Sequence, residues 1–191
     1  MNILEEMEKD WAELTAEELD DLERPDHGQY AGDYEPLWSE VLPGLWQGGT
    51  GEGEDLAYGH LDLKQQITEK DFETVVTLYG SALPPDWFVK EIRIGIYDSD
   101  MKDFQPEQLF DLVRVAHTDW TNGNRVLIRC QAGWNRSGLV TALVLMREGY
   151  TAEDAIALIR KERSEYALCN ADFEQFLLKE DADKWRGETY G

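Results

Sequence analysis

The chain has 191 residues, a formal net charge of −22 at pH 7 and 42% hydrophobic residues. This length and apolar content suit one compact domain with some length left for extensions. A chain this acidic is expected to repel nucleic acid and anionic membranes, which proteins usually bind through clusters of Lys and Arg.

Targeting and cofactor signals are absent from the sequence. It has no signal peptide, apolar run of membrane-spanning length or lipidation motif, which predicts a cytoplasmic protein without a membrane partner. Its two cysteines, Cys130 and Cys169, are too far apart to indicate a disulfide framework, which fits a reducing compartment. The histidines lack the spacing of zinc ligands, so we expect no metal and no other cofactor. No pattern indicates an oligomeric state.

Charge and turn-forming residues divide the chain into three parts. Residues 1–36 are expected to form an acidic N-terminal extension, with two short helices before a linker rich in Gly, Asp and Tyr. Residues 37–180 are expected to form the compact domain, and residues 181–191 a C-terminal tail.

Within the domain, strand-like and helix-like segments alternate along the chain. Strands are expected at residues 37–49 (two, broken by a Pro-Gly turn), 72–79, 89–96 and 125–129. Helices are expected at residues 106–120, 139–146 (beginning near 136), 151–163 and 170–179, with Thr151 and Asn170 as N-caps and Gly149 as a C-cap. This alternation predicts an α/β fold, a single domain with a central, largely parallel sheet of about five strands flanked by helices on both faces.

The junction of the last expected strand and the apolar helix contains the strongest functional motif. Cys130 and Arg136 are spaced so that a curled loop could direct a thiolate and a guanidinium at one small anion. The backbone N–H groups of such a loop and the start of the helix would attract the same anion, while Gly133 and Gly138 permit close approach. The residues expected to bind phosphate are Gln131, Ala132, Gly133, Trp134, Asn135 and Arg136.

This arrangement predicts covalent phosphate chemistry. Thiols at helix N-termini and beside cations ionise readily, so we expect Cys130 to be a thiolate at neutral pH. A thiolate that faces a bound phosphate monoester could attack it and form a phosphocysteine intermediate. Ser137 could then hydrogen-bond the sulfur and help it to leave. Arg136 would hold two phosphate oxygens with its planar fork.

The motif Cys130-x5-Arg136-Ser137 resembles the signature of the cysteine-based protein tyrosine phosphatases, and the wider chain resembles their dual-specificity branch. The similarity spans about residues 37–178. It includes the first strand and turn at residues 42–49, the general-acid loop at residues 94–98, and a closing segment with Arg160-x-x-Arg163 and Asn170-x-x-Phe173.

The resemblance implies roles for residues outside the motif. It places a general acid some thirty residues before the cysteine, which favours Asp98, with Asp100 as the rival. It also implies that Asn170 steadies the loop, a role compatible with capping its helix. Cys169 is expected to be a structural thiol, with a resolving role for an oxidised Cys130 as the alternative.

Two features depart from the pattern of that family. The family usually has His immediately before the cysteine, where this chain has Arg129. Relatives that act on inositol phospholipids usually carry Lys in the loop, and here Gln131, Ala132 and Trp134 bring no positive charge. Trp134 is either an aromatic at the rim of the site or a packing residue.

The sequence therefore predicts a metal-free phosphatase acting on phosphorylated proteins or peptides, with phosphotyrosine, phosphoserine and phosphothreonine all conceivable as substrates. Residues 133–138 also resemble the loop of RNA 5′-triphosphatases, so hydrolysis of RNA 5′-triphosphate or another non-protein phosphate is the enzymatic alternative. The strongly acidic charge argues against an RNA partner. The alternative from another class is a binding module that docks phosphorylated partners and turns over slowly.

Overall fold

A computed structural model describes residues 36–58 and 62–187, all of which belong to one compact unit. The expected helices of the N-terminal extension lie outside the described residues. Within the described ranges, no helix is both long enough and apolar enough to cross a membrane.

Five strands form one sheet in the order β1-β2-β5-β3-β4. The pair β1 and β2 is antiparallel, and the other neighbouring pairs are parallel. This confirms the predicted, largely parallel sheet of about five strands. The strands are β1 (Trp38–Leu42), β2 (Leu45–Gly48), β3 (Thr74–Thr77), β4 (Lys90–Arg93) and β5 (Val126–Arg129).

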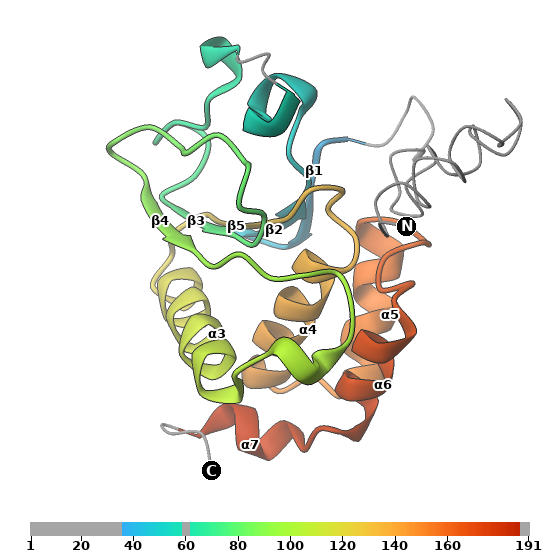
Figure 1. Ribbon diagram of the computed structural model, residues 1–191. Coiled ribbons are helices and arrows are strands. Elements are labelled where there is room, and N and C mark those ends of the chain that lie inside the picture. The colour runs from blue at the N-terminus through green and yellow to red at the C-terminus, as the bar shows by residue number, and fades with distance from the viewer. Residues whose placement is uncertain (1–35, 59–61, 188–191) are drawn as a thin grey trace, which may run out of the picture. The chain divides into compact units, whose positions relative to one another are not determined.

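The two faces of the sheet are covered differently. Figure 1 shows α3, α4, α5 and α6 on one face, and the short 3-10 helices that come after β2 on the other. The chain between β2 and β3 is rich in Gly, which disfavours a long helix. The α-helices are α3 (Pro106–Thr121), α4 (Arg136–Glu148), α5 (Ala152–Glu162), α6 (Ala171–Lys179) and α7 (Ala182–Arg186). The 3-10 helices are η1 (Glu52–Glu54), η2 (Leu56–Tyr58), η3 (Leu63–Gln65) and η4 (Met101–Asp103).

Local capping signals located the helix ends correctly. The Thr151 hydroxyl accepts a hydrogen bond from the Asp154 N–H at 3.1 Å, and the Asn170 side chain accepts one from the Asp172 N–H at 3.0 Å. Gly149 ends α4 with φ +121°, a conformation that favours glycine. All three capping predictions are confirmed.

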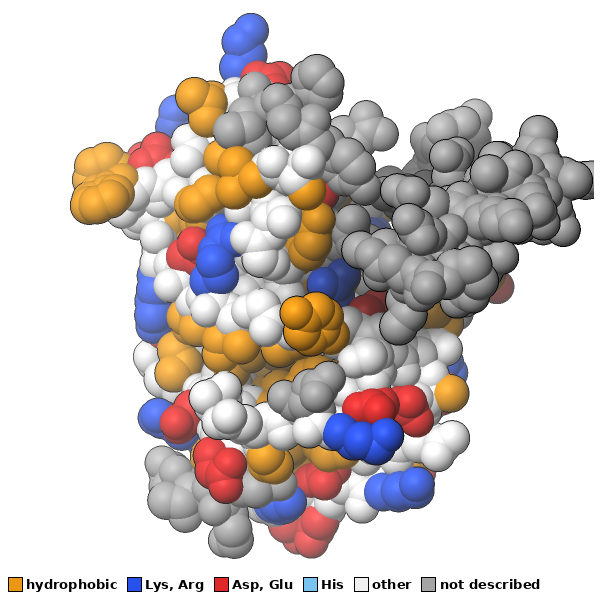
Figure 2. All heavy atoms as spheres, viewed as in Figure 1, with side chains coloured by type: hydrophobic (Ala, Val, Ile, Leu, Met, Phe, Trp, Pro, Cys, Tyr) orange, Lys and Arg blue, Asp and Glu red, His pale blue; other side chains and the backbone are white. Residues whose placement is uncertain are grey.

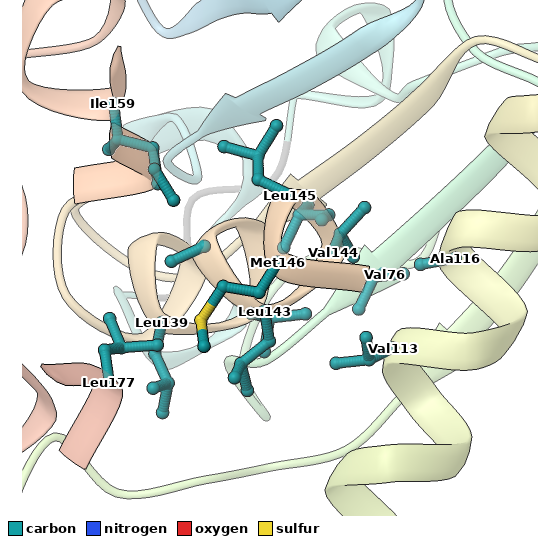
Figure 3. Close-up of a cluster of buried hydrophobic side chains, with 14 of the residues drawn as sticks. Val76, Val113, Ala116, Leu139, Leu143, Val144, Leu145, Met146, Ile159 and Leu177 are labelled. Atoms are coloured by element: carbon teal, nitrogen blue, oxygen red, sulfur yellow. The ribbon is translucent and has the colours of Figure 1, made fainter. Parts of the chain in front are cut away.

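Helix α4 is the centre of the larger core, as its nearly all-apolar sequence from 139 to 146 indicates. Its residues from 136 to 146 are all buried, so the helix is surrounded by protein along most of its length. Figure 3 shows how side chains from neighbouring elements meet those of α4 in this core: Val76, Val113, Ala116, Ile159 and Leu177. The N-terminal end of α4 is therefore held in place by packing against the neighbouring elements.

The chain continues to pack beyond residue 180, where the sequence predicted a tail. Residues Ala182–Arg186 form α7, in which Trp185 is 0% exposed and belongs to the core. Arg147 at the end of α4 donates hydrogen bonds to the carbonyl oxygens of Trp185 and Gly187. At five residues, α7 is too short to show helical periodicity in the sequence, so the expected tail from 181 is corrected to a helix that completes the core.

Candidate active site

The carboxyl ends of β3, β4 and β5 meet at one edge of the sheet, where ligands of open α/β sheets usually bind. Cys130 directly follows β5 and is 1% exposed. Its Sγ accepts a hydrogen bond from the Gly133 N–H at 3.3 Å and lies 3.4 Å from the Ser137 hydroxyl oxygen. The predicted nucleophile therefore sits at the centre of a curled loop, residues 130–136, which we call the phosphate loop.

The backbone of the phosphate loop has free hydrogen-bond donors. The N–H groups of Gln131, Ala132, Trp134 and Asn135 have no acceptor among the residues that the structure describes. They lie at the N-terminus of α4, where the helix dipole favours negative charge. Free amides and a helix start around one thiol form a site for a small anion.

Side chains from distant parts of the sequence hydrogen-bond to the carbonyl groups of the phosphate loop. Gln47 of β2 donates a side-chain hydrogen bond to the Gly133 carbonyl at 3.0 Å, and Arg163 donates to the same carbonyl at 3.2 Å and to that of Ala132 at 3.4 Å. These contacts fix the Gly133 and Ala132 carbonyl groups in place. The sequence did not identify Gln47 in this role; Arg163 was noted only within the closing segment.

Gly133 and the strand end next to it explain why the loop can curl so tightly. Gly133 has φ +80°, and a Cβ there would lie 2.4 Å from the Gly48 carbonyl carbon. A Cβ at Gly138 would lie 3.0 Å from Leu168 Cγ, so the start of α4 also packs closely, as predicted. Substituting Gly133 would move the phosphate loop, because its φ is positive and the atoms that a Cβ would meet belong to the backbone.

Arg136 is the buried cation of the site. Its side chain is 10% exposed, and its Nε has no hydrogen-bond partner among the described residues. One terminal nitrogen donates to the Ile96 carbonyl at 3.4 Å, and the guanidinium lies over the Tyr79 ring, 5.5 Å from its centroid. A buried N–H donor without a partner costs about 1–3 kcal/mol. An anion bound in the phosphate loop would remove that cost.

The two candidate general acids lie in different surroundings. Asp98 Oδ2 is 4.0 Å from Arg136 Nε, and the side-chain amides of Asn135 and Asn170 donate to its carboxylate at 3.2 and 2.9 Å. Asp100 instead caps η4 and pairs with Lys102 at 2.8 Å. The hydrogen bond from Lys102 lowers the pKa of Asp100, so less of this carboxyl group carries the proton that a general acid must donate. The geometry favours Asp98.

Arg129, where the family usually has His, points away from the phosphate loop. It is 0% exposed and donates to Glu54 at 3.0 Å, to the Thr77 hydroxyl at 3.1 Å and to the Leu83 carbonyl at 2.6 Å. Burial raises the pKa of Glu54, against the lowering effects of the Gly51 N–H and of Arg129. The pair fastens η1 to the sheet on the face opposite α4.

Two further residues were assigned alternatives in the sequence. Trp134 is 7% exposed and stacks on Tyr166 with ring centroids 5.3 Å apart, so its ring is a packing element and not an open rim. The Cys169 thiol is exposed and donates to the Asn135 side-chain oxygen at 3.3 Å.

Among the described residues, no group of three His, Cys, Asp or Glu side chains could hold a metal ion.

The fold and this loop define a class of protein: an α/β domain that carries a Cys-x5-Arg anion site after its central strand. Residues 57–182 match the family model described as dual specificity phosphatase, catalytic domain. The chain therefore belongs to the dual specificity phosphatase catalytic-domain family. Membership of this family supports protein phosphatase activity and phosphoprotein substrates.

Individual relatives agree with this assignment. The chain is 29% identical, over 71% of its own length and 92% of the relative's, to protein 123R of Invertebrate iridescent virus 6, whose name assigns it provisionally to the tyrosine phosphatases. Human DUSP28 has the same fold with a TM-score of 0.60 and 21% identity over 75% of this chain and 92% of that one. DUSP15 matches with a TM-score of 0.61 and 22% identity over 78% and 92%.

Proposed function

We propose that the protein hydrolyses phosphate monoesters of protein side chains, phosphotyrosine first and phosphoserine and phosphothreonine as further candidates. The observation that carries this proposal is the buried Arg136 guanidinium, whose Nε has no hydrogen-bond partner among the described residues, next to a thiol surrounded by free amides. Such a site is complementary to the oxygens of a phosphoryl group and presents a nucleophile to its phosphorus.

In the first step, Cys130 Sγ attacks phosphorus, so that an S–P bond forms and the bond from phosphorus to the ester oxygen breaks. The departing oxygen takes a proton from Asp98, which becomes a carboxylate. Arg136 and the loop amides hold the three equatorial oxygens while their charge is redistributed. Proteins of this design need no metal for this step because the fixed donors supply the positive charge.

In the second step, water attacks the phosphorus of the phosphocysteine. The Asp98 carboxylate accepts a proton from this water, the S–P bond breaks and inorganic phosphate leaves. The electron pair returns to sulfur, where the Ser137 hydroxyl can donate a hydrogen bond across the observed 3.4 Å. Each proton that Asp98 loses in the first step is thus recovered in the second.

If Asp98 is the general acid, replacing it should lower activity much more than replacing Asp100. Asp98→Asn should lower kcat/KM on phenyl phosphate, a poor leaving group, by roughly 10²–10⁴-fold, because the phenolate then leaves without a proton. Asp100→Asn should change it little, since Asp100 is engaged in capping η4. Steady-state kinetics of both variants on one substrate decide the matter. A larger loss of kcat/KM in Asp100→Asn would assign the role of general acid to Asp100 instead.

The activity itself is tested with a panel of phosphopeptides carrying each of the three phosphorylated residues, run with chelator present and with vanadate as inhibitor. RNA with a 5′-triphosphate end is assayed in parallel as the alternative substrate. Figure 2 shows that Lys and Arg side chains on the visible face are scattered among acidic and hydrophobic ones, which is unlike an RNA-binding surface. We expect vanadate-sensitive release of phosphate from the peptides. Faster release from the RNA, or phosphopeptide binding without turnover, would contradict the proposal.

A further inference from the structure

Asn135 is placed to cap a helix but does not do so. It occupies the N-cap position of α4 and makes no side-chain capping hydrogen bond. An N-cap asparagine usually has extended backbone angles and accepts a hydrogen bond from the second or third helical N–H. Asn135 instead has helical angles, φ −86° and ψ −67°, so its side chain turns elsewhere. The helix start is thereby left free for an anion.

The Asn135 side chain joins three segments of the chain. Its Nδ2 donates to Asp98 Oδ2 at 3.2 Å. Its Oδ1 accepts from the Asn170 backbone N–H at 3.1 Å and from the Cys169 thiol at 3.3 Å. The phosphate loop, the loop that carries Asp98 and the segment before α6 therefore meet at one amide group.

Asn170 supports Asp98 from the other side. Its Nδ2 donates to Asp98 Oδ1 at 2.9 Å and to the Ser99 carbonyl at 2.9 Å, while its Oδ1 caps α6. Each carboxyl oxygen of Asp98 thus has one amide donor. A protonated carboxyl group keeps acceptor sites on both oxygens, so these contacts can persist while Asp98 holds its catalytic proton.

We infer that Asn135 is the positioning residue of the general acid, with Asn170 as its second anchor, and that together they hold Asp98 beside Arg136 in proton-transfer geometry. The inference rests on the proposed function and deepens it. Asn135 serves the reaction through its backbone N–H, as an anion donor, and through its side chain, as a clamp on Asp98. A small displacement of a catalytic group is enough to lower its rate contribution by about 10²-fold.

The test compares two leaving groups. Asn135→Ala should lower kcat/KM on phenyl phosphate by about 10- to 100-fold, because phenolate needs the proton of a well-placed Asp98. On 2,4-dinitrophenyl phosphate, whose leaving group needs no proton, the loss should be below about 3-fold. Asn122→Ser, at an exposed turn after α3, is the matched control and should resemble the wild type on both substrates.

A double-mutant cycle makes the assignment specific. In an Asp98→Asn background, adding Asn135→Ala should cause no further loss on phenyl phosphate, since the residue that it positions is already disabled. Should Asn135→Ala fail to fold, Asn170→Ser tests the same clamp. Serine keeps an N-cap acceptor for α6 and removes the amide donor to Asp98 without adding a charge beside it. It should reproduce the leaving-group dependence.

The outcomes separate this inference from the proposed function. Equal losses on both substrates, or an undiminished effect of Asn135→Ala in the Asp98→Asn background, would show that Asn135 serves phosphate binding or folding only. Absence of turnover of either aryl phosphate by the wild-type protein would overturn the proposed function, and the role of Asn135 with it.

Discussion

Replacing Cys130 with serine is expected to abolish turnover of aryl phosphates and phosphopeptides while binding of inorganic phosphate survives. A serine hydroxyl is a far weaker nucleophile than a thiolate at neutral pH. The donors for the anion are unchanged, because they are the loop amides and Arg136. Steady-state kinetics and calorimetric titration with phosphate measure the two properties separately.

Arg136→Lys provides the contrasting variant. Lysine keeps the charge but presents no planar fork, so phosphate affinity and turnover should both fall. Cys130→Ser should retain the thermal stability of the wild type, since serine is close in size to cysteine. Turnover that persists in Cys130→Ser and remains sensitive to vanadate would overturn the assignment of the nucleophile. Loss of phosphate binding in that variant would mean that the thiol itself organises the loop.

Local patterns were sufficient to predict much of the phosphate loop and the helix ends. The Cys-x5-Arg motif, the capping residues Thr151 and Asn170, and the buried character of α4 each depend on residues close together in the chain. Such features result from backbone geometry and periodicity over a few turns, which the sequence displays directly. The parallel sheet was predicted from the alternation of strands and helices.

Contacts between residues far apart in the chain could not be predicted from local patterns. Gln47 and Gly133 lie far apart in the chain yet share a hydrogen bond, and no periodicity indicates it. Asp98 and Asp100 differ by two positions, and only the path of the chain after β4 brings Asp98 toward Arg136. The long α-helices lie on one face of the sheet, and the segment between β2 and β3 covers the other with short 3-10 helices, where no helix was expected from the sequence.

The buried pair of Arg129 and Glu54 predicts the largest loss of stability. Their side chains are 0% and 1% exposed and lie 3.0 Å apart. Removing one partner of a buried pair leaves an uncompensated charge and typically costs about 3–5 kcal/mol. Arg129→Met should therefore lower the free energy of unfolding by about that amount, which corresponds to roughly 6–20 °C in Tm for a chain of this size.

Two control variants separate the buried pair from other effects. Arg114→Met removes the partner of an exposed ion pair with Asp111 and should cost less than about 1 kcal/mol. Combining Arg129→Met with Glu54→Gln should cost less than Arg129→Met alone, because the second change neutralises the buried carboxylate. Additive losses in the combined variant would mean that the two residues stabilise the fold independently.

The pH dependence of the stability loss in Arg129→Met shows whether the uncompensated charge is the Glu54 carboxylate. Burial raises the pKa of Glu54 above its usual range, and Arg129 opposes this shift. A carboxyl group whose pKa is higher in the folded state than in the unfolded state stabilises the fold most below the unfolded value, and that stability is lost as pH rises through the folded value. Without Arg129 the pKa of Glu54 in the folded state should rise further. The pH range between the unfolded and the folded pKa of Glu54, over which stability is lost, therefore widens.

The loss in Arg129→Met, measured by urea denaturation, should therefore be larger at neutral pH than at about pH 5, where more of Glu54 is protonated in the folded variant. Glu54→Gln in the same background should remove this dependence, since glutamine does not titrate. A loss that is the same at both pH values would exclude Glu54 as the uncompensated charge. The cost would then lie in the hydrogen bonds that Arg129 donates to Thr77 and Leu83 or in its ion pair with Glu91 at 3.8 Å.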